Sequence, residues 1–341
     1  MRVAIVGATG AVGTIMRRLA RERFGKAELV AFASDRSAGR ELEDGLVCQP
    51  LNEEAIAGFD LALFSAGATR SRAWADRFAE AGALVVDNSS AFRMDADVPL
   101  VVSEVNPEAV EDAPRGIVAN PNCTTMVVML PAKALHDLYR MTAMVATSFQ
   151  AAGGAGQKGI DELAEQVGPV GADVQQLVGD GAAAAAKATP AVHAATLAFN
   201  VVPVLGTVGE NGYTDEEMKL QNESRKILGL PDLAVTPTCV RVPVMVGHSI
   251  AVRATYEREP DLDEALAALA AFPNLVLDDV PTPLEWAGRN ETVVGRVRKD
   301  LADPHSLSFF VVGDNLLKGA ALNTVQIAEV AVERGLVGAR V

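Results

Sequence analysis

The chain has few of the residues that hold disulfide frameworks and metal centres. Its 341 residues include three cysteines and four histidines. The cysteines, Cys48, Cys123 and Cys239, are odd in number and show no CxxC spacing, which argues against a disulfide framework and against a zinc site. No two histidines stand at HxxxH spacing. We therefore expect no metal centre in this protein.

Basic residues are also scarce. Lysine and arginine number 30 against 44 aspartates and glutamates, which makes the formal net charge -14. This balance argues against a nucleic-acid partner, because binding a phosphate backbone needs clustered lysine and arginine. If the substrate is an anion, a few arginines must overcome the acidic field locally. Each arginine beside a motif is therefore informative.

Long hydrophobic runs are absent as well. No run of eighteen uncharged apolar residues occurs, and Met1 to Gly7 enter a strand instead of a signal-peptide pattern. We expect no membrane segment and a cytoplasmic location. The apolar fraction of 49% is ample for buried cores, and a chain of 341 residues is more typical of two domains than of one.

A glycine pattern opens the chain. Residues 2–6 are typical of a strand, residues 7–13 read GxxGxxG, and a helix is expected through Ala20. A second expected strand, Leu29–Ala33, follows. Glycines at such a turn let the backbone approach a pyrophosphate that sits on the helix N-terminus. The combination predicts a dinucleotide site.

The residues after the second strand bear on the choice of cofactor. An acid such as Asp35 would bind the ribose 2'-hydroxyl of NAD, whereas Arg36 would accommodate the 2'-phosphate of NADP. Ser34 and Ser37 flank this pair and make the better phosphate cradle, so we favour NADP. A solvated turn without a ligand is the alternative.

Alternating strands and helices predict a parallel sheet. Further strands are expected at 59–64, 83–87, 100–102 and 116–119, with a helix at 71–81. Ligands of such sheets bind beyond the carboxyl ends of the strands, so one edge would bring a cofactor and a nucleophile together. The residues expected at that edge are Ser65, Gly67, Asn88, Ser89 and Cys123.

Cys123 stands where an apolar strand pattern changes to a helical one, within Asn-Pro-Asn-Cys-Thr-Thr at 120–125. Unpaired N–H groups and the positive end of the helix dipole favour a thiolate there, which makes Cys123 a candidate nucleophile. Free cysteines are also common as small buried hydrophobes. The stretch alone leaves catalysis and packing open.

Two loops offer groups that bind polar ligands. Arg93 follows small polar residues after the 83–87 strand, where it meets a phosphate or carboxylate or lies at the surface. Gln150 ends an expected strand at 144–149 and precedes the glycine-rich residues 151–157. These glycines would let the backbone come close to a ligand.

A helix is expected from Thr214 to Leu228. Thr214 and Glu217 fit a capping box, which gives Glu217 a structural role. Glu216 and Lys219 share a different face of the helix, and the residues alone indicate a solvated ion pair there.

Arg241 and His248 are polar residues within the apolar pattern of 238–249. Arg241 interrupts an expected strand and so faces water or meets an anion. His248 follows a glycine at an expected bend and is a candidate general acid or base, or a structural histidine. The other histidines are expected to be structural (His193) or at the surface (His136 and His305).

The chain ends in an expected strand at 309–312 and an expected helix at about 322–334. We expect this helix to dock on the first domain. The alanine-rich residues 179–187 are expected to be helical and to serve packing or a subunit contact.

In combination, seven motifs make the chain resemble the bacterial aspartate-semialdehyde dehydrogenases over almost its whole length. They are GATGAVG at 7–13, DNSSAFRM at 87–94, NPNCTT at 120–125, FQAAGGAG at 149–156, TDEEMK at 214–219, CVRVPVMVGHS at 239–249 and DNLLKGAA at 314–321. The resemblance implies an α/β protein with an NADP-binding, Rossmann-type parallel-sheet domain at 1–124, completed by 315–341. Residues 125–314 would form an α+β catalytic and dimerisation domain.

Site roles follow from the resemblance. It implies Cys123 as nucleophile, His248 as acid/base and Gln150 as the group that orients the nucleophile or the substrate. Arg241 would hold the substrate α-carboxylate and Glu216 its α-amine. The implied phosphate ligands are Arg93, Asn122 and Lys219, and the implied NADP contacts are Thr9, Gly10, Ala11, Val12, Arg36, Ser37, Ser65, Gly67, Gly153, Gly154 and Asn315.

The chain departs from the family pattern at two cofactor positions. Ala68 stands where the family usually has a glycine, and Gly153 where it usually has a serine. Both departures affect cofactor contacts more than the chemistry.

The resemblance implies NADPH-dependent reductive dephosphorylation of L-4-aspartyl phosphate to L-aspartate 4-semialdehyde, through a thioester on Cys123 and with release of phosphate. This reaction belongs to lysine (diaminopimelate), threonine, methionine and isoleucine biosynthesis, and the family forms homodimers or homotetramers. One alternative is the related N-acetylglutamyl-phosphate reductase, whose substrate lacks a free α-amine for Glu216. The other is a non-catalytic cofactor-binding paralogue, which should lack Cys123, Gln150 and His248.

Overall fold

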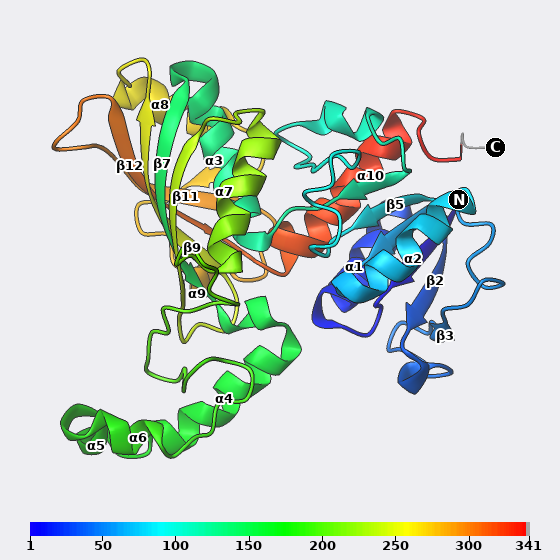
Figure 1. The fold of residues 1–341 in the computed structure, drawn as a ribbon, viewed down its shortest axis with the longest axis horizontal. Coiled ribbons are helices and arrows are strands. Elements are labelled where there is room, and N and C mark those ends of the chain that lie inside the picture. Colours follow the sequence, from blue (N-terminus) through cyan, green and yellow to red (C-terminus); the bar gives the residue numbers. More distant parts are fainter. Residues whose placement is uncertain (339–341) are drawn as a thin grey trace. The chain divides into compact units, whose positions relative to one another are not determined.

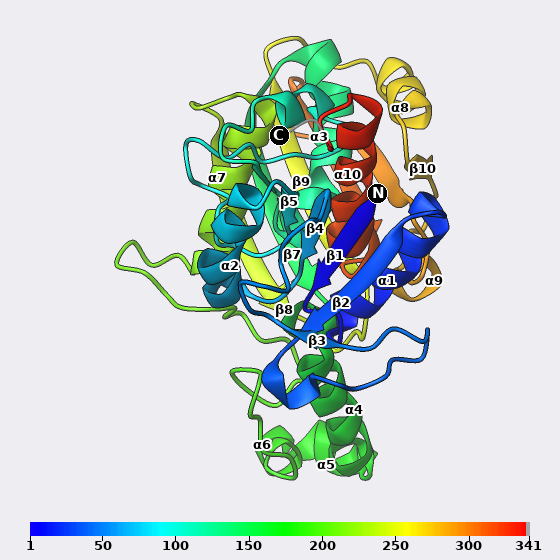
Figure 2. The same ribbon diagram turned by 90° about the vertical axis from the view of Figure 1, so that its right-hand side faces the viewer.

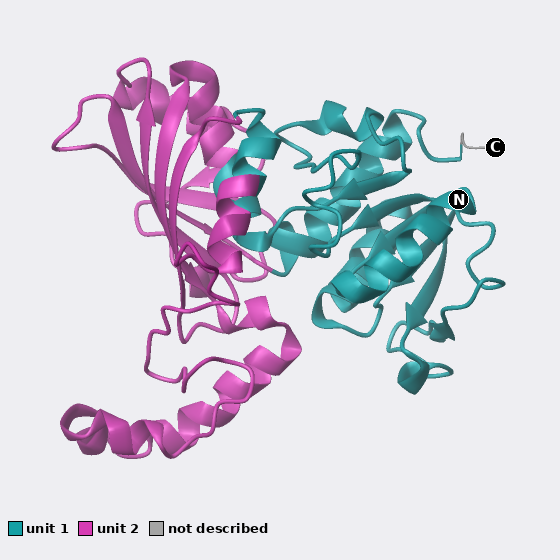
Figure 3. Cartoon of the chain, viewed as in Figure 1, with its two compact units in different colours: residues 1–129, 223–230, 316–341 teal, residues 130–222, 231–315 magenta. Residues whose placement is uncertain are grey.

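The computed structural model describes residues 1–338 and divides the chain into two compact units (Figures 1 and 3). Unit 1 contains Met1–Met129, Glu223–Leu230 and the segment that begins at Leu316. Unit 2 contains Leu130–Asn222 and Pro231–Asn315. Residues 339–341, which the predicted first domain includes, lie outside the described residues.

Unit 1 is built on a six-stranded sheet in which every neighbouring pair is parallel. All residues of three of these strands, β4 (Leu61–Phe64), β5 (Leu84–Asp87) and β6 (Ile117–Ala119), are buried, as expected for strands covered on both faces. This sheet confirms the predicted Rossmann-type domain. In spatial order the strands are β3 (Gln49–Pro50), β2 (Glu28–Ala33), β1 (Arg2–Val6), β4 (Leu61–Phe64), β5 (Leu84–Asp87) and β6 (Ile117–Ala119).

Helices cover both faces of this sheet (Figure 2). Helix α1 (Ala11–Phe24) connects β1 to β2, and α2 (Ala68–Glu80) connects β4 to β5 in the opposite direction across the sheet. Right-handed crossovers therefore put α1 and α2 on opposite faces. Helix α10 (Asn323–Glu333) contacts α1 and contributes Val325 and Ile327 to the apolar core of the unit. The C-terminal helix thus docks on the first unit, as predicted.

The predicted strand at 100–102 is wrong. Only Leu100 forms a bridge, a parallel one with Ala119. The N–H of Val102 donates instead to Oδ1 of Asn106 at 2.9 Å, and the chain turns there. The apolar side chains of this segment are buried, so its composition reflects packing rather than strand pairing.

Unit 2 contains a second six-stranded sheet, which is mixed. Two of its neighbouring pairs are parallel and the others are antiparallel; the parallel pairs are β10 (Leu275–Leu277) with β11 (Thr292–Lys299), and β7 (Met141–Gln150) with β8 (Ala234–Arg241). The mixed sheet confirms the predicted α+β second domain. In spatial order the strands are β10 (Leu275–Leu277), β11 (Thr292–Lys299), β12 (Ser306–Gly313), β9 (His248–Tyr256), β7 (Met141–Gln150) and β8 (Ala234–Arg241).

Two of the remaining helices, α3 (Cys123–Tyr139) and α7 (Asp215–Leu228), contribute residues to both units. Helix α7 has the predicted bounds, and the alanine-rich segment is helical as predicted; its role in a subunit contact stays a prediction. Within the described residues, no helix combines the length and the apolar character needed to cross a membrane. The helices are α3 (Cys123–Tyr139), α4 (Gln157–Gly171), α5 (Val174–Gly179), α6 (Gly181–Ala185), α7 (Asp215–Leu228), α8 (Leu262–Ala271) and α9 (Pro283–Trp286), with short 3-10 helices at Asp35–Ser37, Pro107–Glu111 and Ala152–Ala155 and a π-helix at Leu317–Leu322.

The prediction that His136 lies at the surface is wrong. His136 is buried in the last turn of α3, and its Nδ1 accepts a hydrogen bond from the N–H of Met141 at 3.0 Å. Burial lowers the pKa of this imidazole. Because β7 begins directly after α3, the start of the strand covers the end of the helix. His193 is buried and contacts the carbonyl oxygen of Gly159 at 3.2 Å, and His305 is exposed, both as predicted.

The glycine turn at the start of α1 leads to a prediction about stability. A Cβ on Gly13 would lie 2.1 Å from the carbonyl oxygen of Gly7, whereas a Cβ on Gly10 would lie 3.5 Å from the same atom. Gly13→Ala is therefore expected to lower the free energy of unfolding by about 1–3 kcal/mol, and Gly10→Ala to change it much less. Urea unfolding followed by circular dichroism measures both, and equal stabilities of the two variants would contradict the prediction.

Candidate active site

The predicted cofactor residues of unit 1 lie at the carboxyl ends of its parallel strands. The turn after β1 approaches β2 and β4, because the N–H of Gly7 donates to the carbonyl of Phe32 and the N–H of Ser65 to that of Val6. Thr9 and Gly10 precede α1, and Ala11 and Val12 lie in its first turn. Arg36 and Ser37 lie in the short 3-10 turn after β2, and Ser65 and Gly67 follow β4.

These residues fit a dinucleotide. Gly10 and Gly67 are the N-caps of α1 and α2, and neither helix has a side-chain cap or an acid in its first turn. Both N-termini therefore present backbone N–H groups that suit a phosphate. Gly7 has φ +90°, and a Cβ there would lie 2.3 Å from the carbonyl oxygen of Ser65, so only glycine permits this close approach of the two turns.

Cys123 is the first residue of α3, at the predicted strand-to-helix junction after β6. Oδ1 of Asn122 accepts hydrogen bonds from the N–H groups of Thr124 at 2.9 Å and Thr125 at 3.4 Å, so Asn122 caps this helix. The cap directs the start of α3 and keeps Cys123 in its first turn.

Exposure distinguishes Cys123 from the other two cysteines, all three of which lie within the described residues. Cys48 and Cys239 are buried, whereas Cys123 is partly exposed. Burial raises the pKa of the Cys48 thiol and raises that of Cys239 to about 12. Cys123 is therefore the thiol best placed to meet a substrate.

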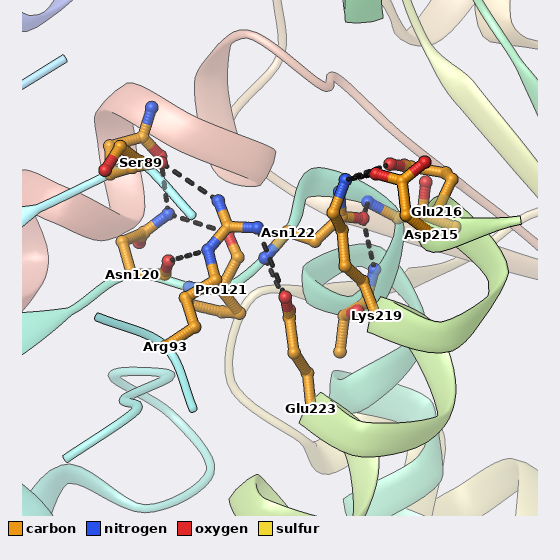
Figure 4. Close-up of polar contacts among 12 residues, drawn as sticks. Ser89, Arg93, Asn120, Pro121, Asn122, Asp215, Glu216, Lys219 and Glu223 are labelled. Atoms are coloured by element: carbon orange, nitrogen blue, oxygen red, sulfur yellow. Dashed lines mark hydrogen bonds and ion pairs between the residues drawn. The ribbon is translucent and has the colours of Figure 1, made fainter. Parts of the chain in front are cut away.

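A buried ion pair between Arg93 and Glu223 stabilises the turn before Cys123 (Figure 4). Glu223, which is 1% exposed, accepts the N–H of Asn122 at 2.6 Å and pairs with Nη1 of Arg93 at 3.2 Å. Nε of Arg93 donates to the carbonyl oxygen of Asn120 at 2.9 Å, and Nη2 donates to that of Asn88 at 2.9 Å. Glu223 is not predictable from the sequence as part of the site, because nothing in the local pattern of α7 separates this glutamate from a solvated one.

In unit 2, the ends of three neighbouring strands bring Gln150, Arg241 and His248 together. Gln150 and Arg241 are paired residues at the carboxyl ends of the parallel strands β7 and β8. His248 begins the adjacent strand β9, directly after Gly247, which bends the chain with φ +98°. The expectation that Arg241 interrupts a strand is corrected: β8 ends at Arg241, and the residues up to Gly247 form a loop.

The backbone of one residue, Ala151, orients both His248 and Arg241. The N–H of Ala151 donates to Nδ1 of His248 at 3.1 Å, and the carbonyl oxygen of Ala151 accepts from Nη1 of Arg241 at 2.7 Å. Because Nδ1 accepts, the neutral imidazole carries its proton on Nε2. Burial, and then the charge of Arg241, hold the pKa of His248 well below its ordinary value.

The start of α7 carries the predicted capping box. The N–H of Glu217 donates to Oγ1 of Thr214 at 3.2 Å, and the N–H of Thr214 donates to Oε2 of Glu217 at 2.8 Å. Oε1 of Glu217 also accepts the N–H of Cys239 at 3.0 Å, which ties the helix to β8. The structural role predicted for Glu217 is confirmed.

Glu216 and Lys219 pair on the other face of α7, at 3.1 Å (Figure 4). The pair is less solvated than the residues alone indicate, since Glu216 is 14% exposed and its Oε1 accepts from Nε2 of Gln150 at 3.3 Å. Burial lowers the pKa of Lys219, but the carboxylates of Glu216 and Asp215 outweigh burial and raise it overall. Lys219 therefore stays charged beside a carboxylate directed at Gln150.

The glycine-rich loop packs closely on these groups. A Cβ on Gly154 would lie 2.5 Å from Nη1 of Arg241 and 3.3 Å from Nε2 of His248, and one on Gly153 would lie 2.9 Å from the carbonyl oxygen of Met245. Asn315 is 2% exposed and its Oδ1 accepts the N–H of Gly247, while its Nδ2 has no hydrogen-bond partner within the described residues. A buried amide donor of this kind suits a polar group of a ligand.

Comparisons with known proteins match both parts of the chain. Residues 2–113 match the family model described as semialdehyde dehydrogenase, NAD binding domain, and residues 132–318 match semialdehyde dehydrogenase, dimerisation domain. An aspartate-semialdehyde dehydrogenase of Streptomyces akiyoshiensis is 50% identical over 332 residues, which cover 96% of this chain and 98% of that protein. One of Corynebacterium glutamicum is 49% identical over 343 residues, with 97% and 99% covered.

A solved structure agrees with these matches. The crystal structure of aspartate semialdehyde dehydrogenase II from Vibrio cholerae, complexed with ASA, has a TM-score of 0.89 and 40% sequence identity. The similarity covers 97% of this chain and 98% of that one. The match of the first unit to an NAD binding domain supports a nicotinamide cofactor there.

The low pKa of His248 leads to a prediction about stability and pH. An unfolded chain binds a proton on histidine at about pH 6.5, whereas the folded protein resists protonation of His248 until lower pH. Below about pH 6.5 the unfolded chain therefore binds more protons, and His248 should lower the free energy of unfolding by up to about 1.4 kcal/mol per pH unit on acidification. Urea unfolding between about pH 5 and pH 8 measures this slope.

The matched variants are His248→Gln, which should flatten the slope, and His305→Gln at an exposed histidine, which should leave it close to that of the parent. An unchanged slope in His248→Gln would show that His248 is not held neutral.

Proposed function

The chain belongs to the aspartate-semialdehyde dehydrogenase family, and we propose that it catalyses the NADPH-dependent reductive dephosphorylation of L-4-aspartyl phosphate to L-aspartate 4-semialdehyde. The observation that carries this proposal is the 50% identity to an aspartate-semialdehyde dehydrogenase over 96% of the chain. A match of that length covers the residues of both units that bear the chemistry, and not only the nucleotide-binding fold.

The first step uses Cys123. Its thiolate attacks the carbonyl carbon of the acyl phosphate, the bond from that carbon to the phosphate oxygen breaks, and phosphate leaves with the electron pair. A thioester remains on Cys123. The partial exposure of this thiol and its place in the first turn of α3 support the assignment, since a helix N-terminus favours the thiolate.

The second step reduces the thioester. The turns after β1, β2 and β4 would hold the nicotinamide cofactor, which would supply the hydride for this reduction. Hydride addition puts a negative charge on the former carbonyl oxygen. When the C–S bond of this thiohemiacetal breaks, the aldehyde is released and the Cys123 thiolate is restored. With Nδ1 held by the N–H of Ala151, His248 carries its proton on Nε2, from which it can donate to this oxygen and take the proton back as the aldehyde forms.

The substrate ligands are those that the resemblance implies, and the charges of these residues are consistent with them. Arg241 holds the α-carboxylate through its guanidinium, and Glu216 holds the α-ammonium. A carboxylate at Glu216 favours aspartyl phosphate over N-acetylglutamyl phosphate, which has no free amine. Arg93, Asn122 and Lys219 bind phosphate, and Gln150 orients the nucleophile or the substrate.

The same proposal includes finer points. NADP is the preferred cofactor, supported by Arg36 and Ser37 in the turn after β2, where Arg36 is exposed. The cofactor contacts are those that the resemblance implies. A homodimer or homotetramer is supported by the dimerisation-domain match at 132–318. We also propose a cytoplasmic location, as for an enzyme of amino-acid biosynthesis.

A direct assay tests the activity and the nucleophile. The protein with L-aspartate 4-semialdehyde, phosphate and NADP+ should form reduced nicotinamide, and Cys123→Ser should lose nearly all turnover, more than about 1000-fold, because no thioester can form. Cys48→Ala, at a buried cysteine, is the matched control and should retain activity where it folds. Turnover of Cys123→Ser within tenfold of the parent would refute the nucleophile, and turnover with the N-acetylglutamate analogue alone would reassign the substrate.

The cofactor preference has its own test. Arg36→Ala should raise KM for NADP+ by about tenfold or more and leave KM for NAD+ nearly unchanged, because only NADP+ carries the 2'-phosphate. Arg40→Ala removes another exposed arginine a few residues on and should change neither value. A higher kcat/KM with NAD+ than with NADP+ in the parent would overturn the preference.

A further inference from the structure

A fully buried lysine lies in unit 1 outside the residues assigned above. Lys318 is 0% exposed and belongs to the π-helix that precedes α10. Its Nζ donates to both oxygens of Glu104, at 2.7 and 2.6 Å, and to Oε1 of Gln326 at 2.6 Å. A buried ion pair of this kind is costly to break, and π-helical turns occur often at functional sites.

Lys318 also orients an asparagine. Its Nζ lies 3.3 Å from Oδ1 of Asn323, the first residue of α10, and the same oxygen accepts the N–H of Ser103 at 3.1 Å. On the other side, Nδ2 of Asn323 donates to the carbonyl oxygen of Val101 at 3.0 Å and to Oδ1 of Asn120 at 2.6 Å. A flipped amide would set its NH2 against two donors and its oxygen against two acceptors. The orientation of Asn323 is therefore determined.

The orientation of Asn323 fixes those of further side chains at the carboxyl ends of the strands. Oδ1 of Asn120 accepts the hydrogen bond from Nδ2 of Asn323. Nδ2 of Asn120 therefore points the other way and donates to Oδ1 of Asn88 at 2.8 Å. Asn88 in turn directs its Nδ2 at Oγ of Ser65, at 3.5 Å. Each amide oxygen accepts from the preceding residue and each NH2 donates to the next. We call this series, Lys318 to Asn323 to Asn120 to Asn88 to Ser65, the amide relay.

The amide relay reaches both the nucleophile and the cofactor side of unit 1. Asn120 is the residue at which the chain leaves β6 and enters the turn to Cys123, and its carbonyl oxygen also accepts Nε of Arg93. Ser65 follows β4 at the edge proposed to bind the cofactor. Because Ser65 Oγ accepts from Asn88, its hydroxyl proton is available to donate to another acceptor.

We infer that Asn323, oriented by the buried Lys318–Glu104 pair, is a positioning residue that sets the turn before Cys123 and the donor direction of Ser65. The inference rests on the proposed function for its kinetic consequences. Its geometric part, that the relay positions the Cys123 thiol, can be measured without turnover.

The test compares two neighbouring buried residues of α10. Asn323→Leu keeps the branching at Cγ with a larger side chain and removes the link to Asn120, and Asn323→Ser is a smaller second variant in case the first folds poorly. Thr324→Val is the matched control, since Thr324 is equally buried and loses only its hydrogen bond to the carbonyl of Ala320. Two readouts are taken on each folded variant: kcat and KM for the aldehyde, and the pH profile of Cys123 alkylation by iodoacetamide, followed on the Cys123 peptide by mass spectrometry.

Both Asn323 variants should lower kcat by about 10- to 100-fold with a much smaller change in KM for the aldehyde, because small misplacements of a reacting group cost that much. They should also shift the alkylation profile of Cys123, whereas Thr324→Val should keep the parent values. Parent-like kcat and alkylation in a folded Asn323 variant, or an equal loss in Thr324→Val, would overturn the inference. If the parent has no dehydrogenase activity, the proposed function fails, and the alkylation profile still decides the positioning role.

Discussion

The start of helix α3 is the constraint on which the chemistry of unit 1 depends. A helix leaves its first N–H groups without partners inside the helix, and Asn122 accepts two of them here. The N–H of Asn122 itself is bonded to Glu223, whose other oxygen meets Arg93. Since Arg93 and Glu223 are both buried, loss of one of them would remove this ion pair from around the remaining charge, which is costly. The place of Cys123 is therefore set by side chains on other elements.

In unit 2 the backbone of Ala151 contacts two residues of the candidate site, His248 and Arg241. Its N–H decides the tautomer of His248, and its carbonyl oxygen decides the direction of Arg241. Gly154 lets the loop lie against both. Burial keeps the imidazole neutral. A neutral histidine with its proton on Nε2 suits a reaction in which that proton is donated to the substrate oxygen and then taken back.

Features that depend on residues close together in the chain are predictable from the sequence. The glycine turn before α1, the bounds of α7 and the capping box of Thr214 and Glu217 each depend on residues a few positions apart, and each is confirmed. Two wrong predictions concern tertiary contacts. The apolar residues at 100–102 pack in the core without forming a strand, and His136 is covered by the strand that follows it. Whether an apolar run pairs or a polar residue is covered depends on neighbours that the run itself does not specify.

The sequence by itself determined the class of fold, the strand-to-helix place of Cys123 and, through seven motifs, the family. Only the tertiary structure decided what holds that place. Arg93 and Glu223 are 130 positions apart, and Asn120 and Asn323 are 203 positions apart. No spacing or period links such residues, because their contact exists only when α7 and α10 fold back on the sheet edge. A buried lysine such as Lys318 is likewise indistinguishable in sequence from a solvated one until its partner Glu104 is brought to it.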